Sequence, residues 1–331
     1  MRRPRALASS RVGSESRGAA GELSRALLLA FLALSAACGS SEAAPGDAIV
    51  GRLERLAFVP AGKLPLQVAG LGALTIDVPR PLLVDMFETT RAEWKAHVAR
   101  RRVANGNGHS GAAESWPETT DDWPASYMTQ HEASEYAVER GMRLPTAGEW
   151  LFIACGPQRF AYPWGSTDQR SIANTLELGL DRPAPVGAFE AGRSAQQVYD
   201  LLGNVAEWTT DLAPTRELVV ADQRVSVLGG SFRNLSRPIL DPRGLEGQSE
   251  VHARAVAPTS RADDVGLRCC ADADEFLAAS LPRIDVDDAV RSRLAAIGQR
   301  WGRRALPLLE ELEGRLRSPE ALEALLAGAR R

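Results

Sequence analysis

The sequence predicts an α+β domain followed by a helical C-terminal tail. In the middle of the chain, short helix starts are interspersed with short strands and with stretches rich in Gly, Asn and Pro. After Cys270 the composition changes to Ala, Leu, Arg and Glu, with apolar residues at helical spacing. A few helices placed among many short strands and long loops indicate an α+β fold.

Short strands are predicted at four places in the chain. Each run carries Val, Leu or Ile at alternate or successive positions, as half-buried and fully buried strands do. The runs are residues 74–78, 82–87, 224–228 and 265–269. Loops are predicted at 105–111 and 116–124, where Gly, Asn and Pro are frequent.

Three short helices are predicted from capping boxes, in which a Thr caps the first turn and a Glu three residues later reaches back. The three pairs are Thr90 with Glu93, Thr129 with Glu132, and Thr146 with Glu149. Apolar residues follow each pair, which supports a helix start at each place.

The tail is predicted to be helical. Val290, Leu294, Ile297 and Trp301 fall at helical spacing, as do Leu308, Leu312 and Leu316. Pro307 should interrupt the run, and the sequence Ser-Pro-Glu at 318–320 should start a last helix. A helical hairpin packed on the domain is the simpler interpretation, and a partner-binding helix is the alternative.

Residues 1–37 are predicted to be a signal peptide. The first 25 residues are basic, with six arginines against two glutamates, and the twelve residues at 26–37, ALLLAFLALSAA, are almost all apolar. That run is shorter than the roughly 20 residues that span a bilayer, and it fits the apolar region of a secretory signal.

The junction from Leu34 to Cys38 resembles a bacterial lipobox, although Ser35 stands where the lipobox prefers Leu. The resemblance implies that Cys38 is acylated and becomes the mature N-terminus, and that residues 38–50 form a lipidated tether. A plain secretory signal or an uncleaved anchor is the alternative. Gly39 replaces the Asp that retains many lipoproteins at an inner membrane, which favours the outer membrane of a bacterial envelope.

Composition excludes one class of partner. The formal net charge is −3, and no long Lys/Arg run occurs outside the extreme N-terminus. Nucleic-acid binding favours a concentrated basic face, so we expect no nucleic-acid partner.

Four sequence blocks carry a family resemblance. They are GMRLPTAGEW at 141–150, YDLLGNVAEW at 199–208, VLGGSF at 227–232 and GLRC at 266–269, and FETTRAEW at 87–94 is a fifth. In this order and spacing they resemble the formylglycine-generating enzyme, or sulfatase-modifying factor, family. The resemblance implies an irregular, loop-rich C-type-lectin-like domain, which we place at residues 51–272, with a helical extension at 273–331.

The resemblance also implies structural calcium. Family members bind calcium at positions that match the side chains of Asp200 and Glu207 and the carbonyls of Gly203 and Val205. A second site would begin at Asn174 and Thr175. Carboxylates mixed with backbone carbonyls suit calcium, and a metal-free hydrogen-bonded turn is the alternative.

The family's redox chemistry is not expected. Its cysteine pair follows the GGS block, yet residues 231–267 contain no cysteine, and Arg233, Ser236 or a near neighbour stands there. Copper(I) is selected by soft sulfur ligands. Nonheme iron needs a clustered ligand set, whereas the four histidines, His97, His109, His131 and His252, are scattered. We therefore expect neither copper nor iron.

Three cysteines remain after Cys38. Relatives in the family often tie the region after the RLPT helix to the terminal strand, which implies a bridge from Cys155 to Cys269 or Cys270. Three buried free thiols are the alternative, because sequence does not give connectivity.

The sequence therefore favours an exported, lipid-anchored protein with a non-catalytic domain that binds a peptide, glycan or protein partner. Groove residues are expected in the loop that carries catalysis in relatives, at Arg233, Asn234, Ser236 and His252. The alternative is a metal-dependent oxidoreductase of the same superfamily that uses non-standard residues. In a third interpretation the protein is structural and its tail helices carry the interaction.

Overall fold

The computed structural model describes residues 45–68, 72–105, 116–212, 224–241, 250–251, 253–316 and 319–331. The signal peptide prediction and Cys38 lie outside these residues. Ala43–Arg331 forms one compact unit. Among the described residues, every helix is too short or too polar to cross a membrane.

A three-stranded antiparallel sheet separates two hydrophobic cores. Its strands are β1 (Leu56–Val59), β4 (Leu82–Asp85) and β11 (Cys270–Asp272), in the order β1–β4–β11. Alternate residues of a strand face opposite sides. Leu56 and Phe58 accordingly join the core that contains the C-terminal helices, whereas Ala57 and Val59 join the core around Trp150. Burial on both faces explains why β1 and β4 read as continuous apolar runs.

A second, four-stranded sheet carries the GNVAEW and GGS blocks. Its order is β10–β5–β6–β9, formed by β10 (Val265–Gly266), β5 (Ala206–Leu212), β6 (Val225–Leu228) and β9 (Ala253–Val256). Two hairpins complete the strands, β2 (Gly62–Val68) with β3 (Gly72–Val78), and β7 (Leu240–Asp241) with β8 (Glu250–Val251). Three strand predictions correspond to β3, β4 and β6. The predicted strand at 265–269 is wrong in extent, because β10 ends at Gly266 and β11 starts at Cys270.

The three predicted helix starts are confirmed. They open α3 (Arg91–Asn105), α4 (Gln130–Glu139) and α5 (Ala147–Cys155). Thr146 caps α5 because its side chain accepts from the Glu149 N–H while the Glu149 carboxylate accepts from the Thr146 N–H. The same exchange occurs at Thr129. The first helix is longer than expected, since α3 continues for 15 residues.

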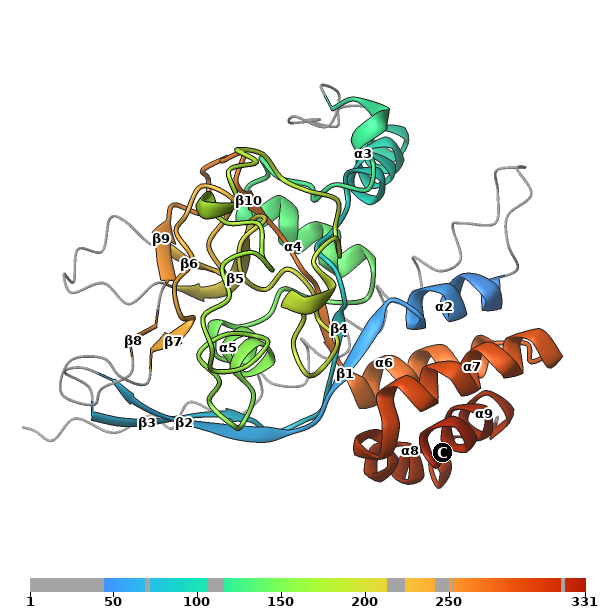
Figure 1. Ribbon diagram of the computed structural model, residues 1–331. Coiled ribbons are helices and arrows are strands. Elements are labelled where there is room, and N and C mark those ends of the chain that lie inside the picture. Colours follow the sequence, from blue (N-terminus) through green and yellow to red (C-terminus); the bar gives the residue numbers. More distant parts are fainter. Residues whose placement is uncertain are drawn as a thin grey trace, which may run out of the picture. The chain divides into compact units, whose positions relative to one another are not determined.

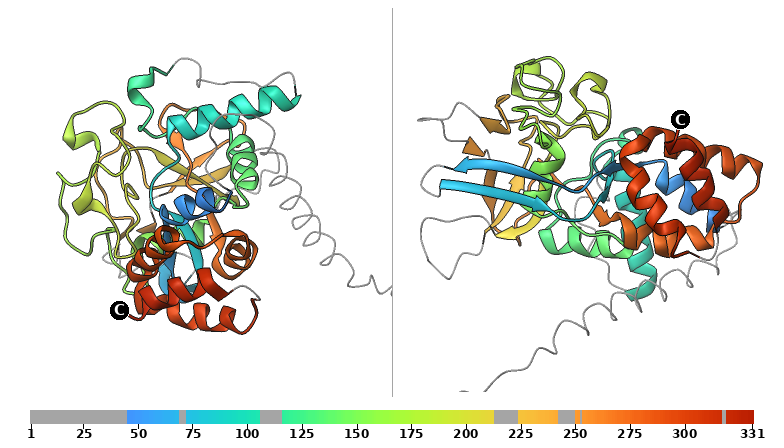
Figure 2. Two further views of the ribbon diagram at one scale, coloured as in Figure 1. Left: turned by 90° about the vertical axis from the view of Figure 1, so that its right-hand side faces the viewer. Right: turned by 90° about the horizontal axis from the view of Figure 1, so that it is seen from below.

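The tail is helical, as predicted. It consists of α6 (Ala273–Ser280), α7 (Asp288–Trp301), α8 (Leu306–Glu313) and α9 (Pro319–Ala329), which gather around β1 in Figures 1 and 2. The Trp301 indole donates to the Leu56 carbonyl at 3.0 Å, which ties α7 to β1. Pro307 does not interrupt a helix. The chain turns earlier, at Gly302 with φ 66°, and Pro307 occupies the first turn of α8.

The boundary predicted for the tether needs correction. Residues 45–50 belong to a helix, α2 (Pro45–Leu53), which lies against α7. Val50 and Leu53 are fully buried there, and Arg293 of α7 donates to Glu54 at 2.7 Å. Burial of this apolar stripe converts a segment that looks like a linker into part of the folded unit.

Candidate functional site

Three of the four expected groove residues lie in one loop. After β6, Asn234 closes a tight turn because its Oδ1 accepts from the Ser231 N–H at 2.9 Å. Arg233 is half exposed and pairs with Asp263 at 2.6 Å. The Ser236 N–H donates to the Glu177 carboxylate at 2.9 Å. The fourth residue, His252, lies outside the described residues.

This loop meets a second segment that carries exposed leucines. The Leu176 N–H donates to the Asn234 carbonyl at 2.9 Å, which places Leu176 beside the loop of Leu235. The exposed fractions of Leu176, Leu180 and Leu235 are 48%, 41% and 51%. We call these three residues the leucine surface. Half of the large apolar side chains that are exposed among the described residues are therefore found on these two segments.

The two expected calcium sites adjoin each other. Asn204 has φ 54°, and its N–H donates to the Asn174 carbonyl at 2.8 Å. Gly203 lies so close to Asn174 that a Cβ would approach its carbonyl oxygen within 2.3 Å, so only Gly fits. Thr175 and Val205 are also buried. The structure thus brings the residues of both expected sites to one buried region.

Glu88 is a further buried carboxylate of this region, and it lies outside the sequence blocks that predict calcium ligands. Its carboxylate accepts from the Asn204 side-chain amide at 2.6 Å and from the Val205 N–H at 3.0 Å. Burial raises the pKa of Glu88 well above its usual range, and the nearby Asp200 and Glu207 carboxylates raise it further. Glu88 follows the predicted apolar strand at 82–87 and precedes the capping box that starts at Thr90. A carboxylate at that position is the sequence signal that could have identified it.

Glu207 lies in a buried ion pair. Arg268 donates from Nη2 to Glu207 Oε1 at 2.7 Å, and the Trp150 indole donates to Oε2 at 2.7 Å. Both Glu207 and Arg268 are almost completely buried. Both carboxylate oxygens are therefore engaged, and a guanidinium stands where a cation would have to approach.

Asp200 is held differently. Its backbone has φ 57°, and its Oδ2 accepts from the Gly187 N–H at 2.6 Å. Burial raises the pKa of Asp200 to about 6, although the Gly187 hydrogen bond and Arg268 act in the opposite direction. The other carboxylate oxygen has no hydrogen bond within the described part of the chain.

The residues fit calcium only in part. Glu207 does not fit as a ligand, because Arg268 and Trp150 already occupy its oxygens. Asn174 does fit, since its Oδ1 is buried without a hydrogen-bond partner, and an orphaned oxygen of this kind suits a hard cation. Where the structure describes the chain, no three His, Cys, Asp or Glu residues are grouped to share a metal ion. The pairing of Asp200 with Glu207 as calcium ligands stays a prediction, and the hydrogen bonds of Glu207 count against it.

The cysteines do not form the expected bridge. Cys155, Cys269 and Cys270 are all free and buried. Cys269 and Cys270 are consecutive residues and belong to different cores, and Cys155 ends α5 in the second core. Burial raises the pKa of Cys155 to about 12, and it raises the pKa of the other two thiols as well. Burial therefore disfavours the reactive thiolate form at all three positions.

The described residues of the loop next to the GGS block do not have the soft ligand chemistry of copper(I). Its side chains are Arg233, Asn234 and Ser236, none of which is a soft ligand. His97 lies elsewhere, buried between α3 and α4, with its Nδ1 2.6 Å from Glu139. His131 is exposed and pairs with Glu135 at 3.5 Å.

The order of the blocks, the two sheets and the turn after β6 define a formylglycine-generating-enzyme-like domain whose loop lacks thiol ligands. The chain belongs to the family described as sulfatase-modifying factor enzyme 1-like domain, whose model matches residues 42–273.

Named relatives point to different activities. The chain is 35% identical over 168 residues to a hercynine oxygenase of Mycolicibacterium thermoresistibile, which covers 42% of this chain and 37% of that protein. It is 31% identical over 169 residues to an inactive C-alpha-formylglycine-generating enzyme 2 of Bos taurus, which covers 46% of this chain and 51% of that protein. The chain thus spans about half or less of these relatives. The solved structure of PvdO from Pseudomonas aeruginosa aligns with a TM-score of 0.49 at 18% identity, over 65% of this chain and 93% of that one.

Proposed function

We propose that the protein is an exported, lipid-anchored binding protein, in which a C-type-lectin-like domain holds a peptide or protein partner at the bacterial envelope without catalysing a reaction. The leucine surface is the observation that carries this proposal. Apolar side chains exposed together on a surface, with polar residues at the rim, are typical of interaction sites. Arg233 and Glu177 supply that polar rim.

The loop itself supports binding rather than redox chemistry. Asn234 and Ser231 hold each other in a closed turn, and Ser231 also donates to Asp264 at 2.9 Å. Arg254 pairs with the same Asp264 at 3.0 Å. These contacts fix the turn and leave Leu235 exposed, which suits a preorganised docking surface. The likeness to a relative named as inactive agrees with this proposal.

We further propose that calcium supports this surface structurally. Asn174 would supply its orphaned Oδ1, and Asp200 would supply the carboxylate oxygen that Gly187 does not use. A bound cation would offset the excess of buried carboxylates beside Asn204. The ion would thereby fix the segment that continues into Leu176.

The test uses envelope extracts of the source organism and three variants of the full chain. Leu176→Asp and Leu235→Asp should each lose the captured partner. Binding would have to remove water from an unpaired carboxylate at the centre of an apolar contact, which costs free energy. Leu74→Asp is the matched control, since Leu74 is also 48% exposed but lies on the β2–β3 hairpin. A partner captured equally by all three variants would refute the leucine surface.

The likeness to hercynine oxygenases favours a second candidate, a metal-dependent oxidoreductase with a non-standard ligand set. Elemental analysis of protein purified without chelator separates the two functions. Calcium without copper or iron supports the binding protein, whereas stoichiometric copper or iron supports the oxidoreductase.

A further inference from the structure

A cavity of about 540 Å³ shares no lining residue with the leucine surface. Its walls come from the segment 160–164, after α5, and from the segment 190–197. This volume falls within the range of pockets that hold one small ligand or one unit of a polymer. The cavity is shallow and broadly open to solvent, so a terminal unit of a larger molecule can lie in it.

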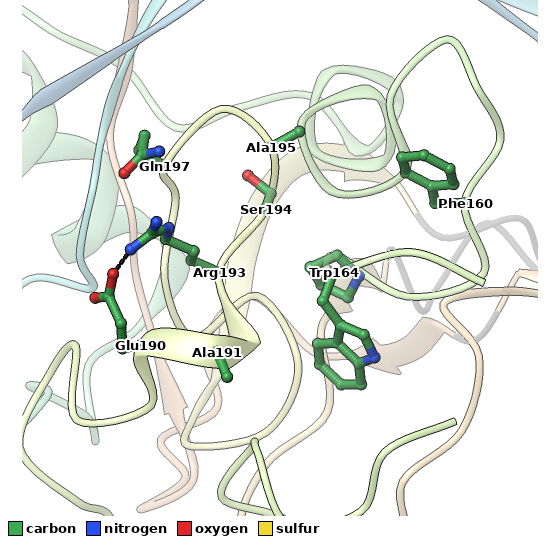
Figure 3. A pocket seen from close by; sticks show the side chains of 9 residues that line it. Phe160, Trp164, Glu190, Ala191, Arg193, Ser194, Ala195 and Gln197 are labelled. Carbon is green, nitrogen blue, oxygen red and sulfur yellow. Dashed lines mark ion pairs between the residues drawn. The ribbon is translucent and has the colours of Figure 1, made fainter. Parts of the chain in front are cut away.

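One wall is flat and apolar. Trp164 stacks on Tyr162 with ring centroids 5.1 Å apart and an interplanar angle of 14°. The Trp164 indole donates to the Thr167 carbonyl at 2.9 Å, which fixes its orientation. Phe160 and Pro163 also line the cavity, and Figure 3 shows Phe160 apart from Trp164 on the same side of the view. A ring held in this way presents a rigid platform that pays little conformational entropy on binding.

The opposite wall carries a neutralised ion pair. Glu190 and Arg193 line the cavity and pair with each other, as marked in Figure 3. The Tyr199 hydroxyl donates to Glu190 at 2.6 Å, and the Arg193 guanidinium lies 6.0 Å from the centre of the Tyr199 ring. The opposite charges cancel, so the wall offers donors and acceptors side by side without attracting a net charge.

Gln197 completes the polar wall under backbone strain. Its φ is 67°, a conformation that costs free energy for a residue other than Gly. Its side-chain amide makes no hydrogen bond within the described part of the chain. Ser194 Oγ accepts from the Val198 N–H at 3.3 Å and retains its own proton for donation. The Gln197 amide thus remains available to a ligand, whereas Ser194 is only 2% exposed.

We propose that this cavity binds a neutral sugar ring, either free or at the end of a glycan. A pyranose has an apolar face of C–H groups, which would lie on Trp164. Its hydroxyls each donate once and accept twice, which matches an alternation of carboxylate, guanidinium and amide groups along the opposite wall. This inference goes beyond the proposed partner site, because the two sites share no residue.

The experiment titrates the full chain with methyl glucoside, methyl galactoside and N-acetylglucosamine, and it follows Trp fluorescence and ligand-observed NMR. We expect at least one of these sugars to saturate with a millimolar dissociation constant. Trp164→Ala should weaken that binding about tenfold or more, through loss of the stacked ring.

Gln197→Gly is the second variant. It separates a loss of sugar binding from a loss of folding. Gly relieves the strain at φ 67°, so the melting temperature should hold or rise while sugar affinity falls severalfold. Asp181→Gly is its matched control, because Asp181 is also strained, with φ 49°, but lies outside the cavity. It should leave sugar affinity unchanged.

Three outcomes would overturn the proposal. They are absence of saturation by every sugar, equal affinity in the Trp164→Ala variant, and tighter binding of glucuronate or N-acetyltyrosinamide than of the neutral sugars. The last result would assign the cavity to an anion or to an aromatic peptide side chain. None of these outcomes bears on capture of a partner by the leucine surface, so the two proposals fail separately.

Discussion

Glu207 and Arg268 lie side by side in the interior, with the Arg268 Nη2 2.7 Å from Glu207 Oε1. Arg268 also donates to the carbonyls of Asp85 and Tyr199, at 2.9 and 2.7 Å. One guanidinium therefore joins β4, β5 and the segment before the GNVAEW block. Such a pair is costly to desolvate, and its value depends on the satisfaction of every donor and acceptor.

Removal of the Arg268 side chain alone should strongly destabilise the fold. Arg268→Leu leaves Glu207 buried without its partner, so the free energy of unfolding should fall by about 3–5 kcal/mol. Urea denaturation measures this change. The exposed pair of Arg291 with Glu320, at 3.3 Å, supplies the control. Arg291→Leu should change stability by about 0.5 kcal/mol or less, and an equal loss in both variants would contradict the argument.

Asp200 should make stability depend on pH. Burial raises its pKa from 3.8 to about 6, so the folded state binds the proton more tightly than the unfolded state does. The contribution of Asp200 to folding therefore becomes less favourable as pH rises between these two values. Other acids titrate in the same range, so the measurement compares urea unfolding of the native chain with Asp200→Asn across this window. The difference between the two should change with pH in calcium-free buffer.

Calcium provides the corresponding test of the metal proposal. A cation bound by Asp200 stabilises the carboxylate and should flatten the pH-dependent difference between the native chain and Asp200→Asn. Calcium should also raise the melting temperature of the native chain, and Asn174→Ala should abolish that rise. A calcium-induced shift of equal size in that variant would count against Asn174 as a ligand.

The tail should depend on two glycines. A Cβ at Gly298 of α7 would lie 2.0 Å from the Leu325 carbonyl oxygen of α9, and a Cβ at Gly328 would lie 1.9 Å from that of Ala295. Gly298→Ala should therefore separate the two helices and reduce the free energy of unfolding by about 1–3 kcal/mol or more. Gly314→Ala is the control, since its nearest neighbour would be 3.7 Å away. Thermal unfolding distinguishes the two variants.

Membrane attachment should depend on Cys38. If Cys38 carries a lipid, Cys38→Ala should shift the protein from the membrane fraction to the soluble fraction, because the acyl chains supply the membrane affinity. Fractionation of cells that express each variant measures this shift. Ser40→Ala should remain with the membrane. Unchanged fractionation of Cys38→Ala would refute the lipid anchor.

The sequence by itself determined the features that depend on neighbouring residues. Helix starts at Thr129 and Thr146 were predictable because a capping box closes within one turn. The helices of the tail followed from apolar spacing, and the missing thiols of the loop followed from composition. The family followed from blocks whose order and spacing are written in the chain.

The tertiary structure decided whatever depends on residues far apart in the chain. Glu207 has the residue type of a calcium ligand, yet Arg268, 61 positions away, engages its carboxylate. Glu88 gained its role only because folding placed Asn204 beside it. Residues 45–50 became helical through burial against α7. In each case the deciding free energy arises from desolvation and from partners supplied by another segment, and local sequence carries no record of either.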